Sequence, residues 1–273
     1  MEFISRIITI LLDLLVRPFG PIRHTLGLVW LSLLSGAGMA LVFRAAAPAR
    51  SVRAAKNRFK SYIYEMRIYQ DSLRAVFGAF ARSLWSNLLY IKAILPPILI
   101  LAVPAILLFY QLDERYGADH LSAGETTVLT VRLSGGADPA ETEAALACGP
   151  GASVDAGPVR ISDTGEISWR LRIEEAGTHR ATLSVDGAAY TLRLVADPAF
   201  WRIARARGSG PLEPFIHPGA PPIPKGSRIE SVRVDYPGAS YPLLFWRTHW
   251  IVIFLFYTIV GAAAIKLAVG FEI

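Results

Sequence analysis

Cysteine is almost missing from the chain, which has Cys148 and no other among 273 residues. A single cysteine excludes an internal disulfide, so a domain outside the cell must be stable through its own apolar core. Acidic residues are also few, with 22 Asp and Glu against 28 Lys and Arg. Because the basic residues are concentrated in one segment, we do not interpret the excess as a nucleic-acid signal, and we expect no nucleic-acid partner.

The sequence also lacks the motifs of catalytic and metal sites. Its histidines are scattered, without a pair at metal-ligand spacing: His24, His120, His179, His217 and His249. No glycine-rich phosphate loop follows a predicted strand, and no serine lies in a nucleophile elbow. We therefore predict a protein that is not an enzyme, with no catalytic residues, no metal and no cofactor.

Long apolar runs are abundant. Apolar residues make up 53% of the chain, and the mean hydropathy is +0.39. A membrane-spanning helix needs about 20 predominantly apolar residues. Three segments meet this requirement, and we predict spans over 23–44, 91–112 and 246–269. Trp246 and Trp250 are typical of a membrane interface at the start of the last span, and Lys266 can extend to the opposite one.

The charge distribution orients these spans. Between the first two spans, basic residues far outnumber Glu65 and Asp71: Arg44, Arg50, Arg53, Lys56, Arg58, Lys60, Arg67, Arg74, Arg82 and Lys92. Short basic loops stay in the cytoplasm. We predict a multi-pass protein of a bacterial-type inner membrane, with residues 45–92 and the C-terminus inside. The N-terminus and residues 113–248 are then outside.

The first residues resemble a signal peptide, because Arg6 precedes an apolar run and "RAAAPA" resembles a cleavage site. Cleavage there would put the basic loop outside, so we expect the N-terminus to be retained. Residues 1–22 instead predict an interfacial helix. In "FISRIITILLDLLVR" the polar residues recur every four positions, at Ser5, Thr9, Asp13 and Arg17. Such a helix lies in the interface plane with its apolar face in the lipid.

Residues 45–90 predict a cytoplasmic helical hairpin. Apolar residues recur in alternating steps of three and four, as in a coiled-coil seam: Val52, Ala55, Phe59, Tyr62, Met66, Tyr69, Leu73, Val76 and Phe80. Both flanking spans enter the same membrane, so the chain must reverse, most simply at 70–72, where Asp71 or Ser72 caps the second helix; Gly78 is the alternative. We expect partners to bind at Phe59, Tyr62, Met66 and Tyr69. A pair of amphipathic helices lying on anionic lipid is the other interpretation.

The segment 118–200 has a different character. "TTVLTVRL", "ISWRLRIE", "HRATLSV" and "YTLRLVA" alternate apolar and polar residues between turn residues. They predict an extracytoplasmic β-sandwich, immunoglobulin-like, with Trp169 in its core. Residues 201–245 follow as an extended Pro/Gly-rich linker, in which "IESVRVDYP" is a return strand that can complete the sandwich. The fold class is thus an α+β membrane protein with a three-helix transmembrane bundle.

The order of elements in residues 1–112 resembles the core of the YidC/Oxa/Alb membrane-protein insertases. Arg44 ends the first span and is followed by Pro48, the basic hairpin and the span "ILPPILILAVPAILLFYQL". In that family a groove arginine precedes the hairpin, and the next span has the pattern Pro-apolar-Pro-apolar-Tyr, matched here by Pro97, Pro104 and Tyr110. Two further spans of the bacterial family are replaced here by the β-domain, so the three-span plan is similar to reduced relatives.

The resemblance implies a membrane chaperone that assists nascent or assembling membrane proteins. Its groove residues would be Arg44, Ser32, Pro97, Pro104 and Tyr110, with Arg44 as a cation that admits polar substrate tails. The alternative is that Arg44 only anchors the inner end of its helix. Ser32, Gly36 and Ala40 form a small-residue ridge suited to helix contact, although such residues are common in membrane helices anyway. A second function also fits, a scaffold whose β-sandwich contacts another envelope protein.

Overall fold

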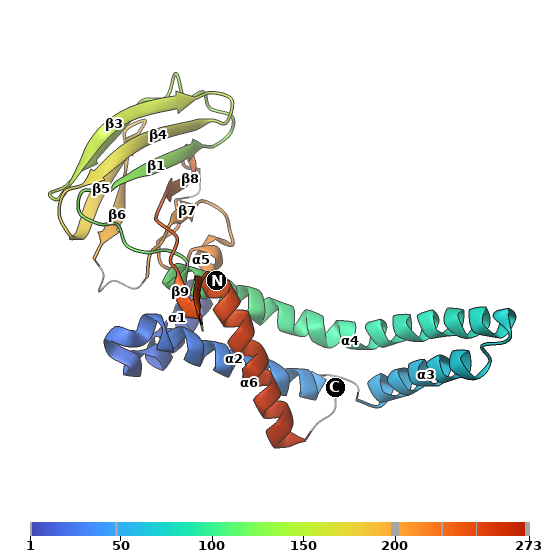
Figure 1. Cartoon of the computed structure of the whole chain (residues 1–273). Helices are drawn as coiled ribbons and strands as arrows, with labels where there is room; N and C mark the ends of the chain where they lie inside the picture. Colours follow the sequence, from blue (N-terminus) through green and yellow to red (C-terminus); the bar gives the residue numbers. More distant parts are fainter. Residues whose placement is uncertain (1, 47–48, 198–201, 225, 244, 271–273) are drawn as a thin grey trace. The chain divides into compact units, whose positions relative to one another are not determined.

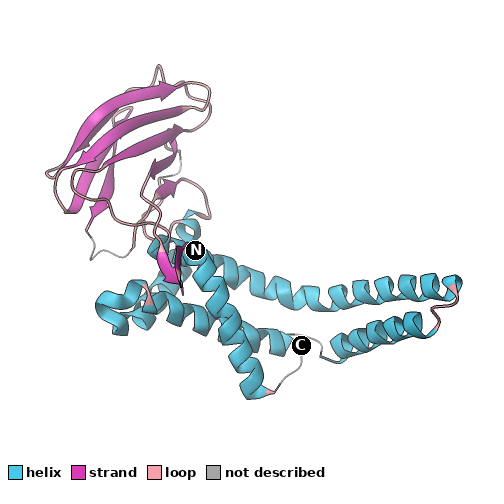
Figure 2. Cartoon of the chain, in the orientation of Figure 1, coloured by secondary structure: helices cyan, strands magenta, loops and turns pink. Residues whose placement is uncertain are grey.

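The computed structural model describes residues 2–46, 49–197, 202–224, 226–243 and 245–270 (Figure 1). The chain is α+β, with long helices and a separate strand-rich part (Figure 2). It divides into two compact units. The first is Met1–Leu31 with Leu107–Phe254, and the second is Ser32–Ile106 with Leu255–Ile273.

Three helices are long and apolar enough to cross a membrane, as the sequence predicted. They are α2 (Leu26–Ala46), α4 (Leu73–Tyr116) and α6 (Trp250–Val269). The helix α4 has 44 residues and continues through Pro96, Pro97 and Pro104. The second hairpin helix and the predicted span 91–112 are therefore one uninterrupted helix. A proline removes one backbone donor, which apolar helices of this length tolerate.

The predicted reversal of the hairpin lies where α3 (Ala49–Ile68) ends and α4 begins. The backbone N–H of Ala75 donates to the Ser72 hydroxyl at 3.4 Å, so Ser72 acts as the N-cap of α4. Glu65 of α3 forms an ion pair with Arg82 of α4, and the Arg82 guanidinium lies 5.6 Å from the centre of the Tyr62 ring. The start of α4 runs alongside α3 (Figure 1). The coiled-coil assignment of this pair stays a prediction.

The strand-rich part contains two antiparallel sheets. The five-stranded sheet has the order β3-β4-β1-β8-β7, and the three-stranded sheet has the order β2-β5-β6. Their strands are β1 (Thr126–Leu133), β2 (Ala144–Cys148), β3 (Ala152–Ile161), β4 (Glu166–Ile173), β5 (Gly177–Val185), β6 (Ala188–Ala196), β7 (Ala206–Gly208) and β8 (Ile229–Val234). A short pair, β9 (Tyr241–Leu243) and β10 (Trp246–Thr248), precedes α6.

One apolar core joins both sheets. It contains Leu129 and Trp169 of the five-stranded sheet and Leu183 and Leu194 of the three-stranded sheet. Trp169 is 3% exposed, as predicted for the central aromatic residue. The alternation of buried and exposed residues along β1 and β4 follows from the period of two in a strand. A β-sheet domain is confirmed, whereas its immunoglobulin-like character stays a prediction.

The segment predicted as an extended linker is instead packed into this domain. Ile203 and Ile223 are 4% and 3% exposed, and the segment also contains β7 and the short helix α5 (Glu213–Ile216). The backbone N–H of Ile223 donates to the carbonyl of Gly208 at 2.8 Å. A Pro/Gly-rich sequence shows no periodicity, but its isolated isoleucines gain by burial. The return strand β8 pairs with β1 and completes the five-stranded sheet.

Candidate functional site

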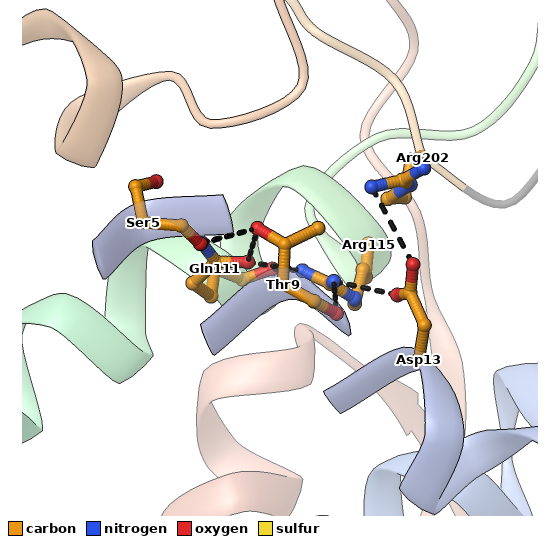
Figure 3. Close-up of polar contacts among 6 residues, drawn as sticks. All are labelled: Ser5, Thr9, Asp13, Gln111, Arg115 and Arg202. Atoms are coloured by element: carbon orange, nitrogen blue, oxygen red, sulfur yellow. Dashed lines mark hydrogen bonds and ion pairs between the residues drawn. The ribbon is translucent and has the colours of Figure 1, made fainter. Parts of the chain in front are cut away.

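The polar stripe of α1 (Glu2–Val16) faces the protein. Ser5 and Thr9 are 4% and 8% exposed. Along the stripe, Thr9 and Asp13 meet polar side chains from the end of α4, and Asp13 also meets Arg202 from the segment before β7. We call this group the polar cluster (Figure 3). It consists of Ser5, Thr9, Asp13, Gln111, Arg115 and Arg202. All six residues belong to the first unit.

Arg115 is the centre of the polar cluster, with a fully buried side chain. One guanidinium nitrogen donates to the carbonyl and the side-chain oxygen of Gln111, at 2.8 and 2.6 Å. The other donates to the Asp13 carboxylate at 2.7 Å and to the Thr9 carbonyl at 3.2 Å. Gln111 is held in turn, because its amide donates to the Thr9 hydroxyl at 2.9 Å. A buried guanidinium needs such partners, because losing its hydration is costly.

Two further contacts join α1 to the Pro/Gly-rich segment that precedes β8. Arg202 lies 3.5 Å from the second carboxylate oxygen of Asp13 (Figure 3). The Ser5 hydroxyl donates to the carbonyl of Pro214. Asp13 therefore forms ion pairs with two arginines from different parts of the chain. The N-terminal helix is thus joined by polar contacts to both α4 and the Pro-rich segment.

The opposite face of α1 is apolar and exposed. Its large side chains are between 40% and 75% exposed: Phe3, Ile7, Ile10, Leu11, Leu14 and Leu15. A soluble helix normally buries such a face and exposes its polar residues. Here the orientation is reversed, with the polar stripe toward the protein. This orientation is what an interfacial helix requires when its outer face contacts lipid.

Glu114 lies beside the polar cluster and is 5% exposed. Neither carboxyl oxygen has a hydrogen-bond partner of normal geometry in the described part of the chain. Gly219 closes over it, since a Cβ added there would come within 2.6 Å of Oε2. The backbone carbonyl of Glu114 accepts from the Ile203 N–H at 2.8 Å. Burying an ionised carboxylate without a donor is costly, so this packing favours the neutral acid.

In the second unit, the small-residue ridge of α2 contacts α6. A Cβ added at Gly36 would lie 2.0 Å from the carbonyl oxygen of Thr258, and one added at Gly261 would lie 2.3 Å from that of Leu33. The Thr258 hydroxyl donates to the Ser32 carbonyl at 3.3 Å. The ridge is thus used for close helix contact. Ser32 is fully buried here, in a helix contact and not on an open surface.

The other predicted groove residues lie as follows. Arg44 is exposed in the last turn of α2. Pro97 is buried and Pro104 is exposed, both within α4. Tyr110, near the end of α4, is 38% exposed. Pro97 and Pro104 are seven residues apart, which places them on the same face of the helix.

The predicted partner-binding residues lie on α3 and the turn after it. Phe59 and Tyr69 are 37% and 55% exposed, while Tyr62 and Met66 are half-buried. Tyr62 is the residue over which Arg82 lies. Large exposed side chains continue on α4, with Phe77 and Trp85 at 70% and 65%. The hairpin therefore presents apolar surface that a partner or lipid can cover.

The sequence did not predict the partners of the α1 stripe. Gln111 and Arg115 follow the apolar run of α4 in "FYQLDERYG", and their spacing of four residues puts them on one helix face. That spacing matches the four-residue period of the α1 stripe. The two together were the signal from which the contact between α1 and α4 could have been predicted. Nothing in the sequence connected either segment to Arg202.

No metal site accompanies the polar cluster: within the described residues, no three His, Cys, Asp or Glu side chains are grouped to hold an ion. Comparisons with protein-family models, curated proteins and solved structures found no match for this chain. The class that the fold defines is an α+β chain with a β-sheet domain and three helices able to span a membrane.

Proposed function

We propose that this chain is an integral membrane protein that assists the insertion or assembly of other membrane proteins without catalysing a reaction. Its partners are membrane lipids and the apolar segments of nascent or assembling membrane proteins. It lies in a bacterial-type inner membrane, with the hairpin and the C-terminus inside. The N-terminus and the β-domain lie outside, because the basic hairpin resists translocation.

The observation that carries this proposal is the uncovered apolar surface of α4. Only 6% of the most apolar window of this helix is buried, against 33% for α2. Large side chains along it are exposed, among them Leu99, Val103 and Ile106. In a membrane, such a surface accepts either lipid or the helix of another protein. The apolar part of α4 follows the basic hairpin along the chain, and this order resembles the arrangement in the YidC/Oxa/Alb insertases.

Arg44 has a specific role in this proposal. It lies exposed at the end of α2, beside the inner interface. A charged side chain in a membrane is costly, about 2.5–3.5 kcal/mol at the helix centre on insertion scales. Kept near the interface in a wetted concavity, a guanidinium would lower the cost of admitting acidic or polar segments of a substrate.

Site-specific photo-crosslinking tests the proposal. A photoreactive residue at Val103 or Tyr110 of α4 should crosslink to a stalled nascent membrane segment. The matched control is Leu267 of α6, which is 84% exposed and equally apolar. Stronger crosslinking from α4 than from Leu267 is expected. Equal, weak crosslinking from all three positions would leave α4 as a lipid-facing anchor and overturn the proposal.

A second function is favoured by the edge of the five-stranded sheet. The strand β3 is at the edge, and its Val154, Val159 and Ile161 are 39%, 59% and 41% exposed. An exposed edge with apolar side chains is a surface on which another chain can add a strand. As a scaffold, the protein would contact another envelope component through β3. Val159→Lys should then abolish capture of that component and leave crosslinking from Val103 unchanged.

A further inference from the structure

The turn between β9 and β10 presents two large aromatic side chains on its surface. Phe245 is 95% exposed, and Trp246, the first residue of β10, is 63% exposed. Single exposed apolar residues are ordinary on a protein surface, whereas adjacent aromatic ones are a candidate contact surface. We call Phe245 and Trp246 the aromatic turn.

The strands that carry the aromatic turn are packed against the rest of the first unit. Tyr241 of β9 is buried, and its ring centre lies 6.1 Å from that of Tyr116 at the end of α4. The guanidinium of Arg247 in β10 donates to the hydroxyl and to the carbonyl of Ser240, at 3.0 and 2.6 Å. The two aromatic side chains are therefore displayed by a fixed support and not by a loose loop.

A candidate membrane span follows the aromatic turn directly along the chain. The helix α6 begins at Trp250, four residues after Trp246. A chain covers at most about 3.5 Å per residue, so Trp246 lies within about 14 Å of the first residue of α6. The headgroup region on each side of the hydrocarbon core is about 5–8 Å thick. When α6 crosses a membrane, the aromatic turn is therefore within reach of the lipid surface.

The sequence places both Trp246 and Trp250 at the membrane interface, but the structure buries Trp250 completely. Its ring centre lies 5.0 Å from that of Phe109 of α4 and 6.3 Å from that of Phe254 of α6. The first turn of α6 thus packs against protein. Of the expected pair, only Trp246 is exposed to lipid, and Phe245 joins it.

We propose that the aromatic turn inserts into the lipid leaflet next to the β-sheet domain. Tryptophan favours the headgroup level, because its ring is apolar while its indole N–H finds a polar partner there. Phenylalanine has no polar side-chain atom and gains when its ring leaves water. The partner of this surface is the lipid surface itself, with no requirement for one kind of headgroup.

The first unit has a second surface of this kind, the apolar outer face of α1. The polar cluster joins α1 to the end of α4, where Tyr116 also supports β9. Two lipid contacts on one support would hold the β-sheet domain at a fixed height over the membrane, whereas attachment through α6 alone would let it tilt. The inference requires that α6 spans the membrane and is independent of the function proposed above.

Spin-label accessibility in lipid vesicles tests the proposal. Cys148→Ser removes the one cysteine of the chain, and Phe245→Cys supplies a new site for the label. The full chain is reconstituted into vesicles of equal parts phosphatidylcholine and phosphatidylglycerol, with a water-soluble nickel chelate on both sides. The matched control is Val159→Cys, an exposed apolar position on β3, which lies far from α1 (Figure 1). The Phe245→Cys label should collide with the chelate about fivefold less often than the control label, because hydrocarbon excludes polar solutes.

A third label, at Ile259→Cys inside α6, separates the proposal from its premise. Protection of the Ile259→Cys and Phe245→Cys labels, with an accessible control, supports the proposal. Equal collision rates for Phe245→Cys and Val159→Cys, with Ile259→Cys protected, overturn the proposal alone. An accessible Ile259→Cys label overturns it together with the span. If Phe245→Cys fails to fold, Trp246→Cys gives the same reading from the adjacent exposed position, and an accessible label there refutes the proposal.

Discussion

The guanidinium of Arg115 donates to the carboxylate of Asp13 at 2.7 Å, across 102 residues of sequence. The contact joins the N-terminal helix to the end of α4 through a charge that is fully buried on the arginine side and about one-third exposed on the aspartate side. A buried charge without its counter-ion is strongly unfavourable. The orientation of α1, polar face toward the protein and apolar face outward, therefore depends on this pair.

The first prediction concerns this pair. Asp13→Ala should destabilise the chain by about 1.5–3 kcal/mol, because Arg115 stays buried and loses a charged acceptor. The lower end is expected, since Asp13 is partly solvated. Arg115→Met should be better tolerated, because it removes the buried charge and keeps the volume. The thermal midpoint in detergent, followed by tryptophan fluorescence, measures both. Asp71→Ala in the exposed hairpin turn is the control, and a fall as large as that of Asp13→Ala would refute the prediction.

The second prediction uses two glycines of α2. Gly36→Ala should lower the thermal midpoint by the equivalent of about 1–3 kcal/mol, because the new Cβ meets the backbone carbonyl of Thr258 and forces α2 and α6 apart. At Gly38 a Cβ meets nothing within 4 Å. Gly38→Ala should therefore be neutral or stabilise by up to about 1 kcal/mol through helix propensity. The two variants differ by two positions in one helix, so equal effects would show that the ridge does not hold α6.

The sequence predicted those features that repeat with a local period. The spacing of Ser5, Thr9 and Asp13 placed them on one helix face, and alternation identified the strands that became β1, β4, β5 and β6. The strands β2 and β3 were not predicted. "AALAC" is short, and Gly157-Pro158 interrupts the alternation of β3. A proline cannot donate to a ladder, so it lowers the strand signal.

Contacts between distant segments could not be predicted in the same way. The pairing of Asp13 with Arg115 depends on how helices pack, for which sequence spacing gives no information. Ile203 and Ile223 have no periodic neighbours, so their burial was not visible in a Pro/Gly-rich segment. Ser32 was assigned to the groove through the family resemblance. The small-residue ridge that contains Ser32 was derived from spacing, and it predicts the contact between Ser32 and α6 that the structure shows.

The third prediction follows from the position of β8. This strand lies between β1 and β7 and supplies Ile229, Val232 and Val234 to the core. A soluble fragment of residues 118–240 should fold and unfold cooperatively, whereas 118–200 should not, because it exposes the edge of β1 and a part of the core. Circular dichroism during thermal unfolding distinguishes them. In the longer fragment Trp169→Ala should cost about 3–5 kcal/mol. Cooperative unfolding of 118–200 would contradict the assignment of β8.

The fourth prediction is a loss of stability at high pH through Tyr236. Burial raises the pKa of its phenol to about 12, against an ordinary value of 10.0, and this effect outweighs the Val195 N–H, which donates to the phenol oxygen and lowers the pKa. The folded state therefore favours the protonated phenol. Stability should be unaffected below pH ~10 and should fall as the pH rises toward 12, by at most about 2–3 kcal/mol at 1.36 kcal/mol per pKa unit.

The test is urea unfolding of the 118–240 fragment between pH 8 and 12. Tyr236→Phe cannot ionise, so the part of the decline due to this phenol should disappear in the variant. At pH 8 the variant should be less stable by about 1 kcal/mol, because the Val195 N–H loses its acceptor. Parallel declines for the two proteins above pH 10 would show that Tyr236 ionises without a stability cost.

The last prediction concerns Arg44, at the end of α2. As a groove cation, it should tolerate Arg44→Lys with partial loss of crosslinking from Val103 to a nascent segment, since the charge remains but the planar fork is lost. Arg44→Ala should lose most of the crosslinking at unchanged protein level, and Arg44→Glu should lose more, because it repels acidic segments. As a helix anchor, Arg44 is replaceable, because Arg53 and Lys56 still hold the orientation. Equal crosslinking by all three variants would assign Arg44 to anchoring and favour the scaffold function of the β3 edge.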